Sequence, residues 1–100
     1  MAIYIEIKKQ KSEKNNIVYF VKTELSGSCE FCVQVFPDTN KLVFYKDDKF
    51  AKKLGTVDLT DVEKKVEIRE IAPSVYGRVI IQILKALKRN EFSPRLDYTA

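Results

Sequence analysis

The sequence contains no histidine and no tryptophan, and it has only two cysteines, three glycines and three prolines. Without histidine, the commonest general base and the commonest metal ligand are both missing. The glycines are scattered, so the chain has no glycine-rich loop of the kind that cradles a phosphate group. We therefore predict no catalytic residues, no bound metal and no cofactor, and we expect a protein that is not an enzyme.

Long apolar runs are also missing. The longest one, residues 17–21, is far shorter than a membrane span. Charged residues begin at Glu6, so the N-terminal segment lacks the pattern of a signal peptide. We expect a soluble, cytoplasmic protein with no membrane partner, folded as one domain over residues 1–100.

The positive charge is concentrated in one segment. The chain has 18 basic and 14 acidic side chains, which gives a net charge of +4. Residues 74–90 carry four bases and no acid, so the remainder of the chain is balanced. An excess confined to one element is weaker than the domain-wide basic surface of a dedicated nucleic-acid-binding protein. The four bases are Arg78, Lys85, Lys88 and Arg89.

Alternation of apolar and polar residues predicts β-strands within residues 2–71. Residues 3–8 have isoleucine at every second position, which is typical of a half-buried strand. Residues 9–16 are polar throughout and predict a solvated hairpin loop. Residues 17–25 begin apolar on both faces and then alternate, which predicts a central strand.

A short hairpin is predicted in the middle of the chain. Residues 30–36 alternate, and residues 41–46 return as the partner strand. Between them, residues 37–40 predict a tight turn, because proline fixes φ and asparagine tolerates a left-handed backbone. Residues 54–59 predict a fifth strand. Residues 66–69 favour a short edge strand, and a helical turn that begins at Asp61 is the alternative.

One long amphipathic helix is predicted over about residues 74–90. Ser74 is the expected N-cap, with Pro73 directly before it, and Asn90 is the expected C-terminal cap. The tail, residues 91–100, is expected to lie extended along the body of the domain. The apolar stripe of the helix comprises Tyr76, Val79, Ile80, Ile83, Leu84 and Leu87.

These elements predict an α+β fold. A sheet with one apolar face needs a cover, and the chain offers a single long amphipathic helix to provide it. We expect an antiparallel β-meander of about five strands, covered on one face by the C-terminal helix.

The two cysteines, Cys29 and Cys32, stand where a strand begins. A zinc site would need two more ligands, which this chain could supply only by sharing the site between two protomers. Redox pairs of this spacing usually begin a helix. In a strand the two residues point to opposite faces and lie about 10 Å apart, which is too far for a disulfide. We predict two reduced thiols with at least one buried, and an intersubunit metal or redox role is the alternative.

Two sets of side chains are candidates for a binding surface. The basic stripe of the helix could meet an acidic protein or a phosphate backbone, or it could simply complement the helix dipole. Aromatic residues on neighbouring strands could form an exposed platform, or the phenylalanines could fill the core while the tyrosines pair across the sheet. The stripe comprises Arg78, Gln82, Lys85 and Arg89. The aromatic residues are Tyr4, Tyr19, Phe20, Phe44 and Tyr45, of which the three tyrosines are the candidate binding residues.

Two stretches carry a family resemblance. They are F-Y-K-D-D-K-F-A-K-K-L-G-T-V-D-L at residues 44–59 and P-S-V-Y-G-R-V at residues 73–79, about a quarter of the chain. Together with a meander followed by a last helix, they resemble short single-domain immunity proteins of bacterial toxin systems. The resemblance implies a protein that masks one cognate toxin without an active site. It carries over no functional residue, and the mildly basic charge departs from the acidic character of many nuclease inhibitors.

The first functional hypothesis is therefore a non-enzymatic protein-binding module whose partner is a cognate toxin. The alternative is a weak nucleic-acid-binding domain that uses the basic helix face. A second copy of the chain is a further possible partner, because the open edge strands of a meander can pair with another chain to form a homodimer.

Overall fold

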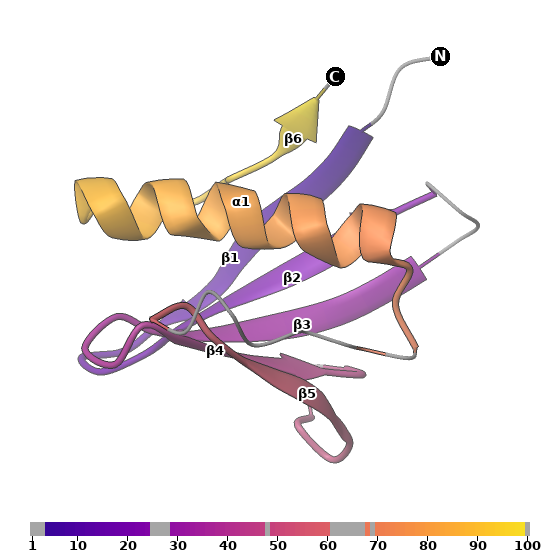
Figure 1. Ribbon diagram of the computed structural model, residues 1–100, viewed down its shortest axis with the longest axis horizontal. Helices are drawn as coiled ribbons and strands as arrows, with labels where there is room; N and C mark the ends of the chain where they lie inside the picture. The colour runs from indigo at the N-terminus through magenta and orange to yellow at the C-terminus, as the bar shows by residue number, and fades with distance from the viewer. Residues whose placement is uncertain (1–3, 25–28, 48, 61–67, 69, 100) are drawn as a thin grey trace.

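The computed structural model of the chain describes residues 4–24, 29–47, 49–60, 68 and 70–99. They form one antiparallel sheet in the strand order β5-β4-β3-β2-β1-β6, with one helix lying across it (Figure 1). The predicted α+β fold is confirmed. The elements are β1 (Tyr4–Ser12), β2 (Ile17–Thr23), β3 (Cys29–Phe36), β4 (Lys41–Tyr45), β5 (Lys53–Asp58), α1 (Pro73–Arg89) and β6 (Tyr98–Thr99).

The register of the strands determines which side chains share a face of the sheet. Val33 of β3 lies opposite Tyr19 of β2 on one side and Phe44 of β4 on the other. This face, which we call the covered face, contributes the largest buried side chains of the core. Its fully buried members include Ile5, Ile7, Tyr19, Val21, Phe31, Val33, Val35, Leu42 and Phe44.

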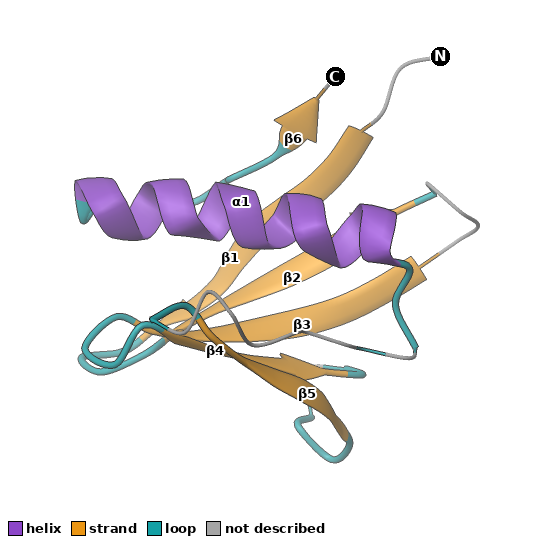
Figure 2. Cartoon of the chain, viewed as in Figure 1, coloured by secondary structure: helices purple, strands orange, loops and turns teal. Residues whose placement is uncertain are grey.

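Helix α1 packs against the covered face (Figure 2). Val75, Val79 and Ile83 point into the same core as the strand residues, one helical turn apart. Ala86 is also buried, whereas Ile81 is 49% exposed. The buried stripe is therefore displaced from the predicted one towards Val75 and Ala86.

The start of the helix corrects one prediction. The N-cap is Ala72 rather than Ser74, and Ala72 makes no side-chain cap hydrogen bond. Pro73 is the first helical residue, where its missing N–H costs nothing and its fixed φ suits the helix. A residue before proline favours an extended backbone, and Ala72 has a ψ of 139°.

Two asparagines adopt the backbone expected of them. Asn90 has a φ of 49° and ends the helix, and its backbone N–H donates to the carbonyl of Leu87. Asn40 has a φ of 53° at the end of the turn between β3 and β4. The predicted C-terminal cap and the predicted central hairpin are both confirmed.

Strand β1 is longer than predicted, and this corrects the assignment of residues 9–16 as a loop. The strand continues to Ser12, with an irregularity between Lys9 and Lys11, and pairs there with Ile17 and Val18. An exposed outer strand can be polar throughout while its backbone still pairs, so its side chains show no apolar alternation.

A sixth strand completes the sheet. The tail lies along the body as predicted, and its last described residues, β6, pair with β1 at the edge of the sheet. The predicted edge strand at residues 66–69 falls outside the described residues except for Ile68, which is buried against Gly55. In the described part of the chain, no helix is long and apolar enough to cross a membrane.

Candidate functional site

The tail lies between β1 and α1, and backbone hydrogen bonds join it to β1. The N–H of Lys9 donates to the carbonyl of Pro94 at 2.7 Å, and the N–H of Leu96 donates to the carbonyl of Ile7 at 2.8 Å. Further along, Tyr98 pairs with Ile5 in the sheet. The tail therefore occupies one flank of α1, and this decides what the predicted basic stripe can do.

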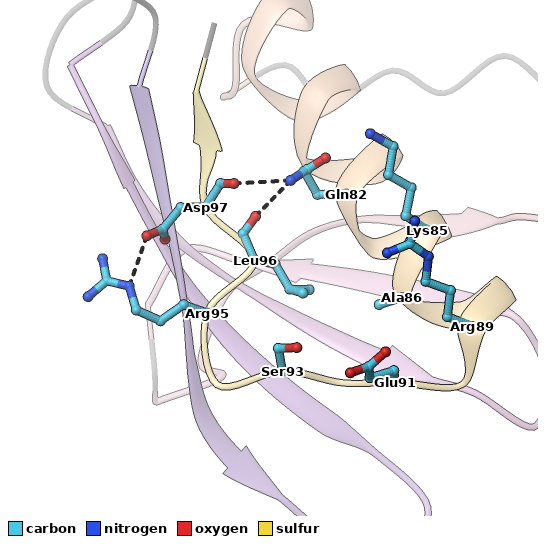
Figure 3. Close-up of a pocket in the computed structure, with 9 residues that line it drawn as sticks. All are labelled: Gln82, Lys85, Ala86, Arg89, Glu91, Ser93, Arg95, Leu96 and Asp97. Atoms are coloured by element: carbon cyan, nitrogen blue, oxygen red, sulfur yellow. Dashed lines mark hydrogen bonds and ion pairs between the residues drawn. The ribbon is translucent and has the colours of Figure 1, made fainter.

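Two members of the stripe hold the tail. The side-chain amide of Gln82 donates to the carbonyls of Leu96 and Asp97, both at 3.1 Å (Figure 3). The guanidinium of Arg78 lies 5.6 Å from the centre of the Tyr98 ring. The side chains of Gln82 and Arg78 therefore interact with the tail and are less available to bind a ligand.

The other two members, Lys85 and Arg89, are exposed and line a cleft between α1 and the tail. They lie one helical turn apart on the same flank (Figure 3). Neither forms an ion pair with another described residue. The four predicted residues therefore lie on one flank, but they divide into two that hold the tail and two that remain free to bind.

The side chain of Asp97 joins the tail to strand β1. Its carboxylate accepts hydrogen bonds from the backbone N–H of Ile7 at 2.9 Å, from Arg95 Nε at 2.9 Å and from the hydroxyl of Tyr4 at 3.2 Å. Arg95 also pairs with Glu6 at 3.4 Å. Burial opposes ionisation of Asp97, but the hydrogen bonds from Ile7, Arg95 and Tyr4 and the charge of Arg95 hold its pKa below the usual value.

Replacing Asp97 with alanine is expected to lower the free energy of unfolding at pH 7 by about 1 to 3 kcal/mol, because Ile7 N–H loses its acceptor. A carboxylate with a lowered folded-state pKa stabilises the protein fully above the unfolded pKa of about 3.9, and this contribution is lost as pH falls through the folded pKa. The difference in unfolding free energy between wild type and Asp97→Ala, measured by urea unfolding, should be smaller at about pH 3 than at about pH 7. An equal difference at both pH values would contradict this role of Asp97.

Tyr19 is not the contact residue that the sequence analysis considered. Its side chain is fully buried on the covered face, and its hydroxyl donates to the carbonyl of Ser93 at 2.9 Å. Burial raises the pKa of Tyr19 to about 12. Tyr19 therefore ties the central strand to the segment that follows α1.

For Tyr19→Phe we expect a loss of about 0.5 to 1.5 kcal/mol of unfolding free energy at neutral pH. An acidic group whose folded pKa is raised stabilises the fold below its unfolded pKa of about 10, and that contribution disappears as pH rises towards about 12. The stability difference between wild type and variant should therefore shrink at about pH 11, as measured by urea unfolding. A difference that grows in alkali would overturn the assignment.

The opposite face of the sheet, which we call the open face, carries a row of side chains in register. Lys8, Phe20, Cys32, Tyr45 and Lys53 lie opposite one another across β1 to β5. Phe20 and Tyr45 are half-buried, and Cys32 between them is completely buried. The row therefore has an apolar centre and a lysine at each end.

Neighbouring rows extend this apolar centre. Val18 and Val43 lie on either side of Gln34 in the next row of the open face. Phe50, in the loop after β4, packs edge-on against Tyr45 with ring centroids 4.8 Å apart. Phe50 has a φ of 57°, which is unusual for a bulky side chain.

The acidic side chains of the open face are engaged within the protein. Glu30 pairs with Lys22 at 3.8 Å, Glu6 pairs with Arg95, and Asp58 accepts hydrogen bonds from Thr60. By contrast, three lysines of this face form no ion pair with another described residue. These lysines are Lys8, Lys41 and Lys53.

The cysteines are free thiols on opposite faces of β3. Cys32 is buried on the open face, and its thiol donates to the side-chain oxygen of Gln10 at 3.8 Å. Cys29 is half-buried and packs against the core, and both burial and the charge of Glu30 raise its pKa. The prediction of two reduced thiols with at least one buried is confirmed. Among the described residues, no group of three or more histidine, cysteine, aspartate or glutamate side chains could hold a metal ion.

Of the three predicted tyrosines, the structure brings Tyr4 and Tyr45 to the open face and Tyr19 to the core. Tyr4 is 48% exposed, but its hydroxyl is bound by Asp97 and Arg95. The aromatic centre is built instead from Tyr45 and Phe20, and the expectation that Phe20 fills the core is wrong. Apolar residues at every position of residues 17–21 were the signal for this placement, because such a run on a sheet with one helix leaves some side chains uncovered.

Comparisons with protein-family models, with curated proteins and with solved structures find no match to this chain. Its function is therefore argued from its own residues.

Proposed function

We propose that this protein is a non-enzymatic protein-binding module and that its contact surface is the open face of the sheet. The observation that carries the proposal is the row of Lys8, Phe20, Cys32, Tyr45 and Lys53, with its aromatic centre and lysine ends.

Strand composition supports the choice of this face. An antiparallel sheet with a helix on one side normally alternates between apolar residues inside and polar residues outside. Strands β2 and β4 depart from this pattern, because Val18, Phe20, Val43 and Tyr45 point away from α1. Val18 and Cys32 are buried outside the core that α1 covers, so the open face has an apolar patch of its own.

The chemistry of the patch suits a protein surface. Protein interfaces combine a core rich in aromatic residues with a polar rim, and a few aromatic anchors supply most of the binding energy. Here Phe20 and Tyr45 would be the anchors, and the unpaired lysines would form the rim. Because the rim is positive and the acids of this face are already paired, the partner is expected to present an acidic rim around an apolar centre.

The resemblance to immunity proteins makes a cognate toxin the expected partner. A broad face that blocks a partner by covering it requires no reaction chemistry, which agrees with a sequence that contains no histidine and no glycine-rich phosphate loop. The specific test is whether producing this protein protects cells from the toxicity of the partner that it binds.

Nucleic-acid binding is the competing function, and the basic stripe was its proposed surface. The affinity of a phosphate track rises with the number of cationic side chains that can reach phosphate groups. Gln82 and Arg78 are engaged with the tail, so Lys85 and Arg89 are the two members left on this flank. This shortens the basic track and favours the protein-binding function.

The experiment is affinity capture of the tagged protein from its native cells, with and without nuclease treatment. We expect the wild-type protein to capture a stoichiometric protein partner that remains bound after nuclease treatment. The Ile81→Ala variant, changed on the outer side of α1, should still capture this partner, and the Phe20→Ala variant should not. Recovery of nucleic acid alone, released at moderate salt, would overturn the proposal.

A further inference from the structure

A cleft lies between α1 and residues 91–97 (Figure 3). Its helical wall carries Lys85, Ala86 and Arg89, and its opposite wall is formed by the tail around Leu96. Ala86 is buried, so the floor is apolar between two cationic side chains. The cleft does not overlap the open face.

The walls of the cleft are held in place by hydrogen bonds. The side-chain amide of Gln82, on the helix, donates to two carbonyls of the tail, and the hydroxyl of Tyr19, on the sheet, donates to the carbonyl of Ser93. The N–H of Glu91 donates to the carbonyl of Ala86 at 3.0 Å, which fixes the end of the helix against the start of the tail. A ligand would therefore enter a preformed cleft, which lowers the entropic cost of binding.

The charges that remain available in the cleft are mostly positive. The carboxylate of Asp97 is turned away from α1 towards Arg95 (Figure 3), and both are engaged with each other. Lys85 and Arg89 have no such partner among the described residues. Glu91, at the margin of the cleft, is the one acidic lining residue outside the Arg95–Asp97 pair.

We infer that this cleft binds a carboxylate group of an acidic peptide segment, with Arg89 and Lys85 as its ligands. The fork of an arginine matches the two oxygens of a carboxylate, and a neighbouring ammonium adds a second charge-assisted hydrogen bond. The inference rests on the proposed function in one respect, since the ligand is taken to be part of a protein.

One feature favours a carboxylate over a phosphate backbone. Glu91 lines the same cleft, and its negative charge opposes a polyanion with several phosphate groups more than it opposes a single carboxylate. Lys88 lies in the last turn of α1 but does not line the cleft, so it serves as a matched control.

The test is an NMR titration of the full chain with an acetylated, amidated peptide of alternating glutamate and leucine, and with the same peptide containing glutamine. We expect millimolar binding of the glutamate peptide, with amide shifts clustered at the cleft. Arg89→Ala combined with Lys85→Ala should weaken it at least fivefold, and Lys88→Ala should leave it unchanged. Glu91→Gln should strengthen it, because a repulsive charge is removed.

Equal binding of the glutamine peptide, or an Arg89→Ala, Lys85→Ala protein that binds normally, would overturn the inference. Tighter binding of inorganic phosphate or of an oligothymidylate at the same residues would also overturn it and assign the cleft to phosphate groups. Phe20→Ala should not affect this titration, so failure here is separable from failure of the open face in the capture experiment.

Discussion

Replacing Phe44 with alanine is expected to lower the free energy of unfolding by about 3 to 5 kcal/mol, measured by urea denaturation. Phe44 is completely buried on the covered face, and its ring centroid lies 5.8 Å from that of Phe31. The truncation would leave a cavity in the core on the covered face that close-packed neighbours cannot fill. Against a typical total stability of about 5 to 15 kcal/mol, this is a large share.

Phe20→Ala is the matched control, since the same side chain is removed from the other face of the sheet. Phe20 is half-buried, so a loss well below that of Phe44→Ala is expected. Equal losses at the two positions would mean that both faces are cores of similar quality, and the division into covered and open faces would be wrong.

Affinity for the captured partner is expected to fall about 30-fold or more in Phe20→Ala and in Tyr45→Ala, measured by calorimetry with purified proteins. This corresponds to about 2 kcal/mol, the usual threshold for an interface anchor. The two rings flank Cys32 at the centre of the row, where a partner would exclude water most completely. Both variants should remain folded, because neither ring belongs to the core under α1.

Ile81→Ala provides the control for this result, because it also removes a half-exposed apolar side chain but from the outer side of α1. Its affinity for the partner should change much less than that of Phe20→Ala. If Ile81→Ala weakened binding more than either open-face variant, the helix would be the principal contact surface.

The sequence predicted the fold well where one face of a strand is apolar and the other polar. Phe31, Val33 and Val35 alternate with polar residues, and all three are buried under α1 as that pattern requires. The left-handed backbone of Asn90 and Asn40 could also be predicted, because few other residues tolerate that conformation.

The faces of the tyrosines were not predictable in the same way. Tyr19 lies within an apolar run, so either face was compatible with its neighbours, and a shift of one residue in pairing would exchange them. The register with β3 places Tyr19 opposite Val33, in the core, and Phe20 opposite Cys32, on the open face.

The helix stripe was incompletely predicted because its surroundings come from distant segments. Helical spacing correctly places Gln82 and Arg78 away from the apolar stripe, but it contains no information about the tail. The tail docks beside them and accepts the hydrogen bonds of Gln82. The polar stretch of β1 was missed for a related reason, since backbone pairing with Val18 leaves no trace in its side chains.

The most direct test of the open face is lysine footprinting of the purified complex with an amine-reactive reagent, read by mass spectrometry. The chain carries exposed lysines on both sides, so each complex contains its own control. We expect Lys8 and Lys53 to lose reactivity on binding while Lys88 on the outer side of α1 keeps it. Protection of Lys88, with Lys8 and Lys53 still reactive, would show that the open face of the sheet is not the partner-binding surface.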